Sequence, residues 1–261
     1  MKDIIIPALI MGGIALLLGS LLAVASVVFK VKKNEKAEKI REALPGANCG
    51  GCGYAGCSAY ADAVVSGAEI NLCTAGGQKA QDAIAEIMGV EKCEFVEKRA
   101  QVLCGGECGA VTEKNIYDGV CDCLAAERVG MGPKNCTYGC LGLGSCVSVC
   151  RFDAISIVNG IAKISESKCT ACGMCVKICP RGVIELKPAA SRVYVRCVSH
   201  DKGAEVRKNC GVGCIGCGIC QKNCPADAIT LNDGVAEIDS SKCSGCGICA
   251  EKCPQKCIAA G

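Results

Sequence analysis

The sequence predicts an α+β protein with an N-terminal transmembrane helix, a small helical domain and two tandem modules of short helices and a β-hairpin. Three observations predict this fold class. Residues 4–29 contain no charged side chain, a long segment repeats 74 residues later, and 28 of the 261 residues are cysteine. The expected parts are a membrane anchor (1–33), the helical domain (34–92), a cysteine-containing linker (93–135), module 1 (136–190) and module 2 (191–261).

The uncharged stretch is long enough to cross a bilayer, because a membrane helix needs roughly 20 apolar residues. Basic residues follow it at Lys30, Lys32, Lys33 and Lys36. The positive-inside rule therefore predicts a single pass through the cell (inner) membrane, with every cysteine on the cytoplasmic side. A cleaved signal peptide is the alternative, but the run is too long and its amino end too weakly basic.

The segment 34–92 has the pattern of a helical domain. Glu35 and Lys39 have the i,i+4 spacing of a surface helix over 34–43, and residues 80–88 place apolar side chains on one helical face. Four cysteines lie between them among glycines, which let a backbone approach a bound group closely. These cysteines are Cys49, Cys52, Cys57 and Cys73. We expect them to hold one metal cluster.

Module 2 carries the most specific motif in the chain. Its runs 214–225 and 243–254 both have the spacing C-x2-C-x2-C-x3-C-P, which binds [4Fe-4S] clusters in bacterial ferredoxins. The first three cysteines wrap a loop around a cubane, and the fourth points away and binds the neighbouring cluster. Zinc is satisfied by two C-x2-C pairs, and disulfides would consume the thiolates that iron needs, so both alternatives are disfavoured.

Module 1 is a copy of module 2. Adding 74 to the residue number maps seven of its cysteines onto cysteines of module 2, namely Cys140, Cys146, Cys150, Cys169, Cys172, Cys175 and Cys179. Residues 155–164 and 229–238 alternate apolar and polar side chains around an Asn-Gly or Asp-Gly pair, which predicts β-hairpins with type I′ turns. We expect each module to fold around two clusters.

One position breaks the repeat, since Leu143 stands in the place of Cys217. The cluster bound by Cys140, Cys146 and Cys179 then lacks a fourth ligand. Either Cys136 supplies it or the site holds a three-iron cluster, and we favour Cys136. The other predicted ligand sets of the modules are Cys150 with Cys169, Cys172 and Cys175, then Cys214, Cys217 and Cys220 with Cys253, and Cys224 with Cys243, Cys246 and Cys249.

The linker adds cysteines whose partners the spacing leaves open. Candidate ligands of a sixth cluster are Cys104, Cys108 and Cys123. Adding 74 maps Cys123 onto Cys197 and Cys136 onto Cys210, although module 2 needs neither of its two for its own clusters. These thiols are therefore free to serve another site. The cysteines that fit no spacing are expected as small buried apolar residues; they are Cys93, Cys121 and Cys257.

The composition argues against other classes of function. A net charge of +3, which bound clusters would turn negative, and 3% aromatic residues offer no surface for nucleic acid. No nucleophile–base pair or nucleotide motif in a strand–helix frame is found, so no catalytic residue is predicted. A thiol-rich metal store would not need such regular repeats.

A specific order of motifs runs through the chain: the expected N-terminal helix, residues 44–57 (LPGANCGGCGYAGC), residues 138–146 (YGCLGLGSC) and the two modules. This order resembles the B subunit of the Rnf complex, in the longer form of anaerobic bacteria. The resemblance implies an electron-relay subunit of a membrane complex that moves electrons from reduced ferredoxin to NAD and translocates Na⁺ or H⁺.

The resemblance also implies flavin and NAD sites on partner subunits of the membrane complex. Five [4Fe-4S] clusters are expected from the cysteine spacings. Family members carry further cysteines that match Cys104, Cys108, Cys123, Cys136, Cys197 and Cys210, which favours a cluster on some of them and leaves a sixth open. The alternative function is a membrane-tethered polyferredoxin that serves another oxidoreductase, such as a hydrogenase. Co-purification with flavin-bearing membrane subunits separates the two.

Overall fold

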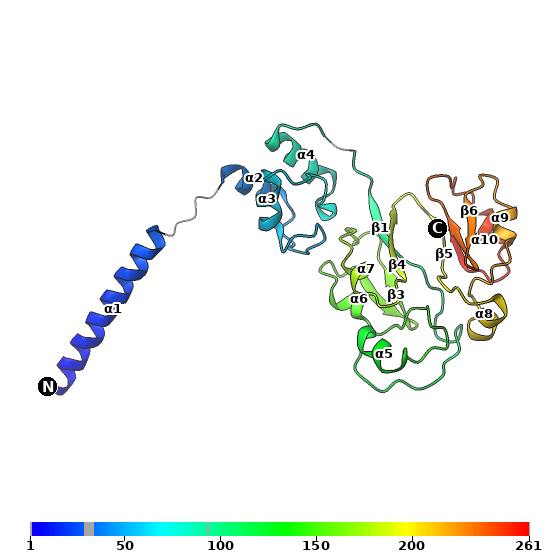
Figure 1. Cartoon of the computed structure of the whole chain (residues 1–261), viewed down its shortest axis with the longest axis horizontal. Coiled ribbons are helices and arrows are strands. Elements are labelled where there is room, and N and C mark those ends of the chain that lie inside the picture. Colours follow the sequence, from blue (N-terminus) through cyan, green and yellow to red (C-terminus); the bar gives the residue numbers. More distant parts are fainter. Residues whose placement is uncertain (1, 29–33, 93, 261) are drawn as a thin grey trace.

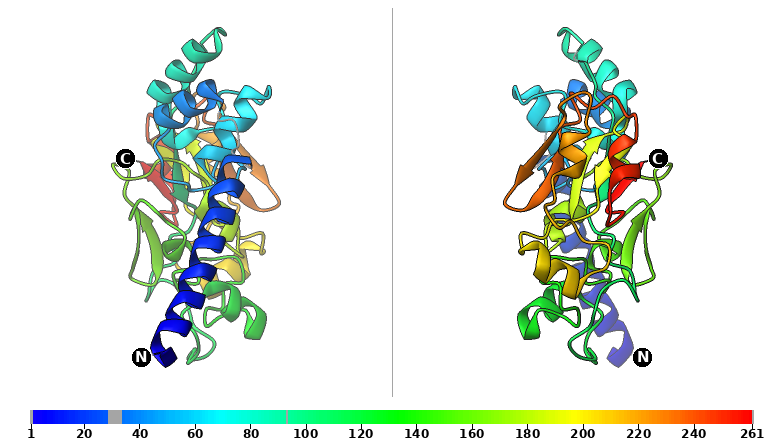
Figure 2. Two further views of the ribbon diagram at one scale, coloured as in Figure 1. Left: turned by 90° about the vertical axis from the view of Figure 1, so that its left-hand side faces the viewer. Right: turned by 90° about the vertical axis from the view of Figure 1, so that its right-hand side faces the viewer.

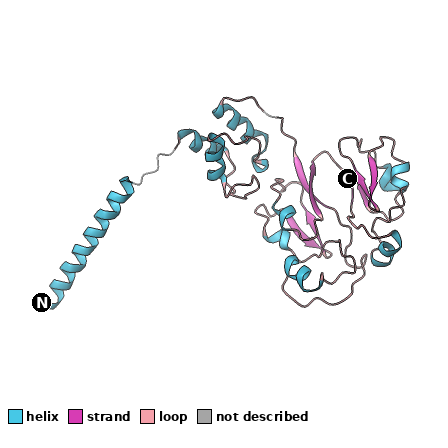
Figure 3. Ribbon diagram, viewed as in Figure 1, coloured by secondary structure: helices cyan, strands magenta, loops and turns pink. Residues whose placement is uncertain are grey.

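The computed structural model describes residues 2–28, 34–92 and 94–260 of the chain (Figure 1). The N-terminal part consists of helices and loops, and the strands lie in the C-terminal part (Figure 3). Cys93, which the sequence analysis expects as a small buried residue, lies outside the described residues.

Helix α1 (Lys2–Val28) covers the stretch for which the sequence predicts a transmembrane helix. The prediction of a membrane span is contradicted, because no helix in the described parts of the chain combines the length and the apolar character that crossing a membrane requires. Lys30, Lys32 and Lys33, on which the predicted orientation depends, lie outside the described residues.

A small helical domain follows, built from α2 (Glu35–Ala43), α3 (Cys57–Val65), the 3-10 helix η1 (Thr74–Gly76) and α4 (Gly77–Met88). The Asn34 side chain caps α2 by accepting a hydrogen bond from the amide of Lys36 (3.0 Å), and α4 ends at Gly89 in the left-handed conformation. The side chains at the centre of the core are Ile40, Tyr60, Val64 and Ile84. The cysteine-bearing loops pack against this core.

The two modules form the rest of the molecule. Module 1 and the segment before it contain β1 (Lys98–Val102), α5 (Cys123–Gly130), α6 (Ser145–Ser148), β2 (Ile155–Val158), β3 (Ile161–Ile164), α7 (Met174–Ile178) and β4 (Ile184–Pro188). Module 2 contains β5 (Val193–Val195), α8 (Gly203–Asn209), α9 (Ile219–Lys222), β6 (Ile229–Asn232), β7 (Val235–Ile238), α10 (Ile248–Lys252) and β8 (Ile258–Ala260).

Both predicted hairpins are confirmed. Strands β2 and β3 pair antiparallel, and β6 pairs with β7 in the matching register. The turn residues Asn159 and Gly160 have φ of 50° and 73°, and Asp233 and Gly234 have 42° and 84°. Positive φ at both central residues is the requirement of a type I′ turn. The hairpins lie on opposite sides of the molecule (Figure 2).

Two further strand pairings are not predicted by the sequence. Strand β1, which comes from the expected linker, pairs antiparallel with β4 and places Val102 opposite Ile184. Strand β5 pairs with β8 in the same way and places Val195 opposite Ile258. The segment before module 1 is therefore part of its fold, because each module closes its core with a strand contributed from upstream.

Candidate iron–sulfur cluster sites

The thiols of the described cysteines are free, and most are buried or half-buried. Within residues 2–28, 34–92 and 94–260, no three His, Cys, Asp or Glu side chains come close enough together to hold one metal ion. The ligands of a four-iron cluster bind different irons at the corners of a cube. They therefore surround a cavity rather than meet at a point.

Five cavities have at least four cysteines in their walls. We number the sites from the N-terminal domain to the C-terminus. Site 1 lies in the helical domain, where a cavity of about 350 Å³ is lined by Cys49, Cys52, Cys57 and Cys73. The loop is held by Asn48, whose Oδ1 accepts a hydrogen bond from the amide of Cys57 (2.8 Å) at the start of α3. Burial raises the pKa of the Cys73 thiol. The structure thus brings together the four cysteines predicted for this site.

Site 2 lies in module 1. Its cavity, about 330 Å³, is lined by Cys150, Cys169, Cys172 and Cys175. Two backbone amides point at the ligand sulfurs: that of Ala100 at Cys169 Sγ (3.5 Å) and that of Ala154 at Cys150 Sγ (3.4 Å). Burial raises the pKa of Cys175 to about 11, so this thiol would have to give up its proton on binding a metal. This set also matches the prediction.

Site 3 differs from the sequence prediction in one residue. Its cavity, about 320 Å³, is lined by Cys123, Cys140, Cys146 and Cys179. Cys136, favoured as the fourth ligand, does not line it, and Cys123 takes that place. Burial raises the pKa of Cys146 to about 12, with the thiols of Cys140, Cys123 and Cys179 adding to the rise. These four thiols are therefore mutual neighbours.

Local hydrogen bonds hold Cys123 at site 3. Asp122 caps helix α5, and its Oδ1 accepts from the amide of Ala125 (2.8 Å). The hydroxyl of Ser145, at the start of α6, donates to Asp122 Oδ2 (2.7 Å) and accepts from the amide of Cys123 (2.7 Å). The cap of α5 is thereby tied to the helix that carries Cys146.

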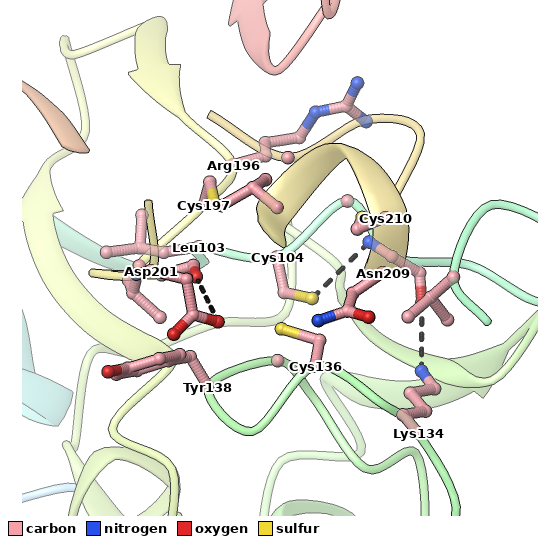
Figure 4. A pocket seen from close by; sticks show the side chains of 18 residues that line it. Leu103, Cys104, Lys134, Cys136, Tyr138, Arg196, Cys197, Asp201, Asn209 and Cys210 are labelled. Atoms are coloured by element: carbon pink, nitrogen blue, oxygen red, sulfur yellow. Dashed lines mark hydrogen bonds between the residues drawn. The ribbon is translucent and has the colours of Figure 1, made fainter. Parts of the chain in front are cut away.

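Site 4 lies between the modules. A cavity of about 470 Å³ is lined by Cys104, Cys136, Cys197 and Cys210 (Figure 4). Cys104 stands two residues after β1, and Cys197 stands two residues after β5. Each module therefore supplies one cysteine after its upstream strand and one before its first cluster loop. Neither Cys108 nor Cys123, the other candidates for a sixth cluster, lines this cavity.

Sites 5 and 6 belong to module 2. A cavity of about 340 Å³ is lined by the predicted set of site 5, Cys214, Cys217, Cys220 and Cys253, and also by Cys257. Cys257 Sγ lies 3.5 Å from Cys253 Sγ, and the neighbouring Cys257 thiol lowers the pKa of Cys214. The place of Cys257 beside the ligand set of site 5 could not be predicted from the sequence, because Cys257 fits no ligand spacing.

The fourth predicted set of the modules, site 6, consists of Cys224, Cys243, Cys246 and Cys249. Burial raises the pKa of Cys249, and the thiols of Cys243 and Cys246 contribute. The amide of Ala228 points at Cys224 Sγ (3.4 Å), as that of Ala154 points at Cys150 Sγ in site 2. Sites 2 and 6 are thus built alike. Cys121, expected from the sequence as a small buried residue, is instead exposed, so that prediction is wrong.

The cavities suit an anionic group that accepts hydrogen bonds. Two buried donor atoms without a partner among the described residues belong to residues that line them: Thr170 Oγ1 at site 2 and Arg181 Nη1 at site 3. Unpaired buried donors are costly, and the sulfides and thiolates of a four-iron cluster would accept from them. The donor set and these orphaned donors therefore fit iron–sulfur clusters.

Comparison with protein families supports the same chemistry. Residues 44–75 match a family model described as "Putative Fe-S cluster", residues 162–185 match "4Fe-4S binding domain", and residues 213–257 match "4Fe-4S dicluster domain". The three matched segments contain ligands of sites 1, 2, 3, 5 and 6.

Three relatives match the chain over nearly its whole length. It is 45% identical to the B subunit of the Na⁺-translocating ferredoxin:NAD⁺ oxidoreductase complex of Acetobacterium woodii, over 99% of this chain and 78% of the relative. It is 42% identical to the B subunit of the ion-translocating oxidoreductase complex of Methanosarcina acetivorans, over 99% of both chains. The B subunit of the proton-translocating ferredoxin:NAD⁺ oxidoreductase complex of Clostridium ljungdahlii is 41% identical, over 92% of this chain and 86% of the relative. With identity of this level along the full chain, and with the Rnf resemblance confirmed, the protein belongs to the family of B subunits of ion-translocating oxidoreductase complexes.

Proposed function

We propose that this chain is the electron-relay subunit of an ion-translocating ferredoxin:NAD⁺ oxidoreductase, with six [4Fe-4S] clusters at sites 1 to 6. Soluble ferredoxin is the proposed electron donor, and other subunits carry the electrons on to NAD⁺. When bound, such clusters take up and release single electrons. The observation that carries the proposal is that the six cysteine sites form one unbroken series of neighbours.

Site 1 adjoins site 2. The hydroxyl of Thr74, next to Cys73, donates a hydrogen bond to the carbonyl of Ala171 (3.0 Å), next to Cys172. A Cβ on Gly51 would lie 2.4 Å from the carbonyl oxygen of Cys172, so the two ligand loops touch. Only glycine permits this approach between the helical domain and module 1.

Sites 2, 3 and 4 follow one another through module 1. Cys175 of site 2 is one of the thiols whose proximity adds to the raised pKa of Cys146 in site 3, after burial and closer thiols. The amide of Cys140, a site 3 residue, points at Cys104 Sγ of site 4 (3.3 Å). The backbone of a site 3 residue is therefore in contact with a thiol of site 4.

Site 4 connects with module 2. Burial raises the pKa of Cys197 to about 11, and its neighbours include Cys214 of site 5 and Cys136 of site 4. Sites 5 and 6 share helices, because α9 carries Cys220 of site 5 and leads to Cys224 of site 6. Helix α10 carries Cys249 of site 6 and leads to Cys253 of site 5. Close spacing of this kind suits transfer of single electrons along the chain.

The ligand set at site 4 replaces the one that spacing suggests for a sixth cluster. Cys104 remains a proposed ligand there, Cys123 moves to site 3, and Cys108 is not used. We further propose that the chain works at the cytoplasmic face of the cell membrane, in contact with the other subunits of the complex. This location rests on the family alone.

The test is the metal content of the anaerobically purified chain. Six cubanes predict about 24 iron and about 24 sulfide per chain, with low-potential electron paramagnetic resonance (EPR) signals after reduction by ferredoxin. About 20 of each would leave only five clusters and refute the assignment of six. A chain that co-purifies with a hydrogenase and not with flavin-bearing subunits would instead support the polyferredoxin alternative.

A further inference from the structure

A buried lysine stands between site 3 and site 4. Lys134 is 3% exposed, and its Nζ donates three hydrogen bonds, to the carbonyl oxygens of Gly106 (2.9 Å), Cys140 (2.8 Å) and Gly160 (2.8 Å). The side chain also lines the cavity of site 4 (Figure 4). Its surroundings are therefore the ligand loops of two proposed clusters.

The hydrogen bonds indicate that Lys134 is positively charged. Three donated bonds use all three N–H groups of an ammonium, whereas a neutral amine has only two. The carbonyls come from three separate segments of the chain, so the ammonium is held in place from several sides. Carbonyl dipoles solvate the charge but do not neutralise it.

No carboxylate neutralises Lys134 among the described residues, because none of their ion pairs includes it. A charge buried without a counter-charge is strongly unfavourable. The partners of Lys134 belong to cysteine-bearing loops: it donates to the backbone carbonyl of Cys140, whose thiol lines site 3, and to that of Gly106, whose amide points at Cys104 Sγ of site 4 (3.4 Å). Clusters at sites 3 and 4 would supply the missing anionic partner.

We propose that Lys134 is an electrostatic tuning residue for the clusters at sites 3 and 4. Reduction adds one electron to a cluster and makes it more negative, with no bond made or broken in the protein. A fixed positive charge stabilises that reduced state and raises the reduction potential. The electron is therefore favoured at the junction of the two modules. This inference rests on the proposed function, which supplies the clusters.

The chain contains a matched control. Adding 74 to 134 gives Lys208, and both lysines precede Asn-Cys. Lys208 lies on α8 with its side chain 75% exposed, and its Nζ is 3.9 Å from Glu205. The two lysines occupy equivalent positions in the repeat, but only Lys134 is buried against ligand loops.

The experiment is an EPR-monitored redox titration of the anaerobic full chain with Lys134→Met, Lys134→Arg and Lys208→Met. We expect Lys134→Met to keep the iron content and to lower one or two midpoint potentials by about 59 mV or more, which is a tenfold change in the one-electron equilibrium. Lys134→Arg and Lys208→Met should titrate like the unmodified chain. Unchanged potentials in a fully loaded Lys134→Met variant would overturn the proposal.

A further variant covers the case in which Lys134→Met loses iron. Lys134→Gln keeps hydrogen-bond donors without the charge. Iron restored by Lys134→Arg but not by Lys134→Gln supports the charge. Restoration by Lys134→Gln with unaltered potentials, or by neither variant, assigns Lys134 a purely structural role and overturns the proposal. Failure of the proposed function is seen in a separate variant, Cys210→Ala, which carries no change at Lys134. If site 4 holds no cluster, this variant keeps the iron content of the unmodified chain.

Discussion

The exchange of Cys136 for Cys123 at site 3 leads to a sharp prediction about iron content. Replacing any one ligand by alanine should remove one four-iron cluster, about 4 of about 24 irons per chain. Single variants cannot say which cysteines share a cluster, since each loses the same amount. Pairs can, because two ligands of one cluster lose it only once.

The structure groups Cys140 with Cys123 around site 3 and places Cys136 at site 4. Cys140→Ala combined with Cys123→Ala should therefore lose about 4 irons, as Cys140→Ala does alone. Cys140→Ala combined with Cys136→Ala should lose about 8, because two four-iron clusters are gone. The measurements are iron and acid-labile sulfide per chain in anaerobic preparations, with EPR spin counts as a second readout.

The opposite pattern would refute the reasoning. If the pair with Cys136 loses about 4 irons and the pair with Cys123 loses about 8, the ligand favoured from the sequence is correct. A further control is Cys121→Ala, since Cys121 is exposed and lines none of the cavities described above. That variant should keep all its iron.

Three more predictions test the contacts of individual sites. Gly51→Ala should slow electron transfer between sites 1 and 2, because its Cβ would lie 2.4 Å from the carbonyl oxygen of Cys172 and would push the two ligand loops apart. Freeze-quench EPR measures the transfer rate. As a control, Gly130→Ala should transfer electrons at the normal rate, because Gly130 has open space around it. Cys257→Val installs the residue found 74 positions earlier, Val183. It should lower the reduction potential of the cluster at site 5 by up to about 59 mV, because hydrogen bonds to ligand sulfurs raise the potential. A redox titration that shows no shift would contradict the contact of the Cys257 thiol with the ligand sulfurs. Tyr60→Phe should cost about 1 kcal/mol, because the hydroxyl donates to the carbonyl of Glu69 and accepts from the amide of Leu72. Burial raises the pKa of Tyr60 from 10.0 to about 12, so stability should fall as pH rises from 10 to 12 by up to about 1.4 kcal/mol per unit; denaturation at several pH values should show this slope in the unmodified chain and not in Tyr60→Phe.

Features encoded by short spacings could be predicted from the sequence. The hairpin turns at Asn159-Gly160 and Asp233-Gly234 follow from two adjacent residues that tolerate positive φ. The cysteine sets around sites 1, 2 and 5 follow from spacings within one loop plus one returning cysteine. Local geometry determines such features, so a single sequence is sufficient for them.

Site 4 could not be predicted, because its ligands obey two different offsets. Cys136 and Cys210 are 74 residues apart, whereas Cys104 and Cys197 are 93 apart. The difference is an extra 19 residues in module 1 between its upstream strand and its first cluster loop. A single offset of 74 therefore matched Cys197 with Cys123 rather than with its structural counterpart, Cys104. The extra residues also bring Cys123, which lines site 3 and is the proposed substitute for the cysteine missing at Leu143.

The transmembrane prediction failed for a different reason. It depended on the absence of charge over residues 4–29 and on lysines that follow it, not on any contact within the fold.

The strand pairs β1–β4 and β5–β8 were missed because each joins segments far apart in the chain. Short apolar stretches of this kind do not reveal their partners.

The shared ownership of site 4 has a mechanical consequence. Two of its cysteines come from one module and two from the other. A cluster there would therefore crosslink the two modules as well as conduct electrons between them. Oxygen damage that strips iron from this one position would loosen the joint and interrupt conduction in the same event. Each module would then keep its own clusters and could still be reduced, but electrons would no longer pass from one module to the other.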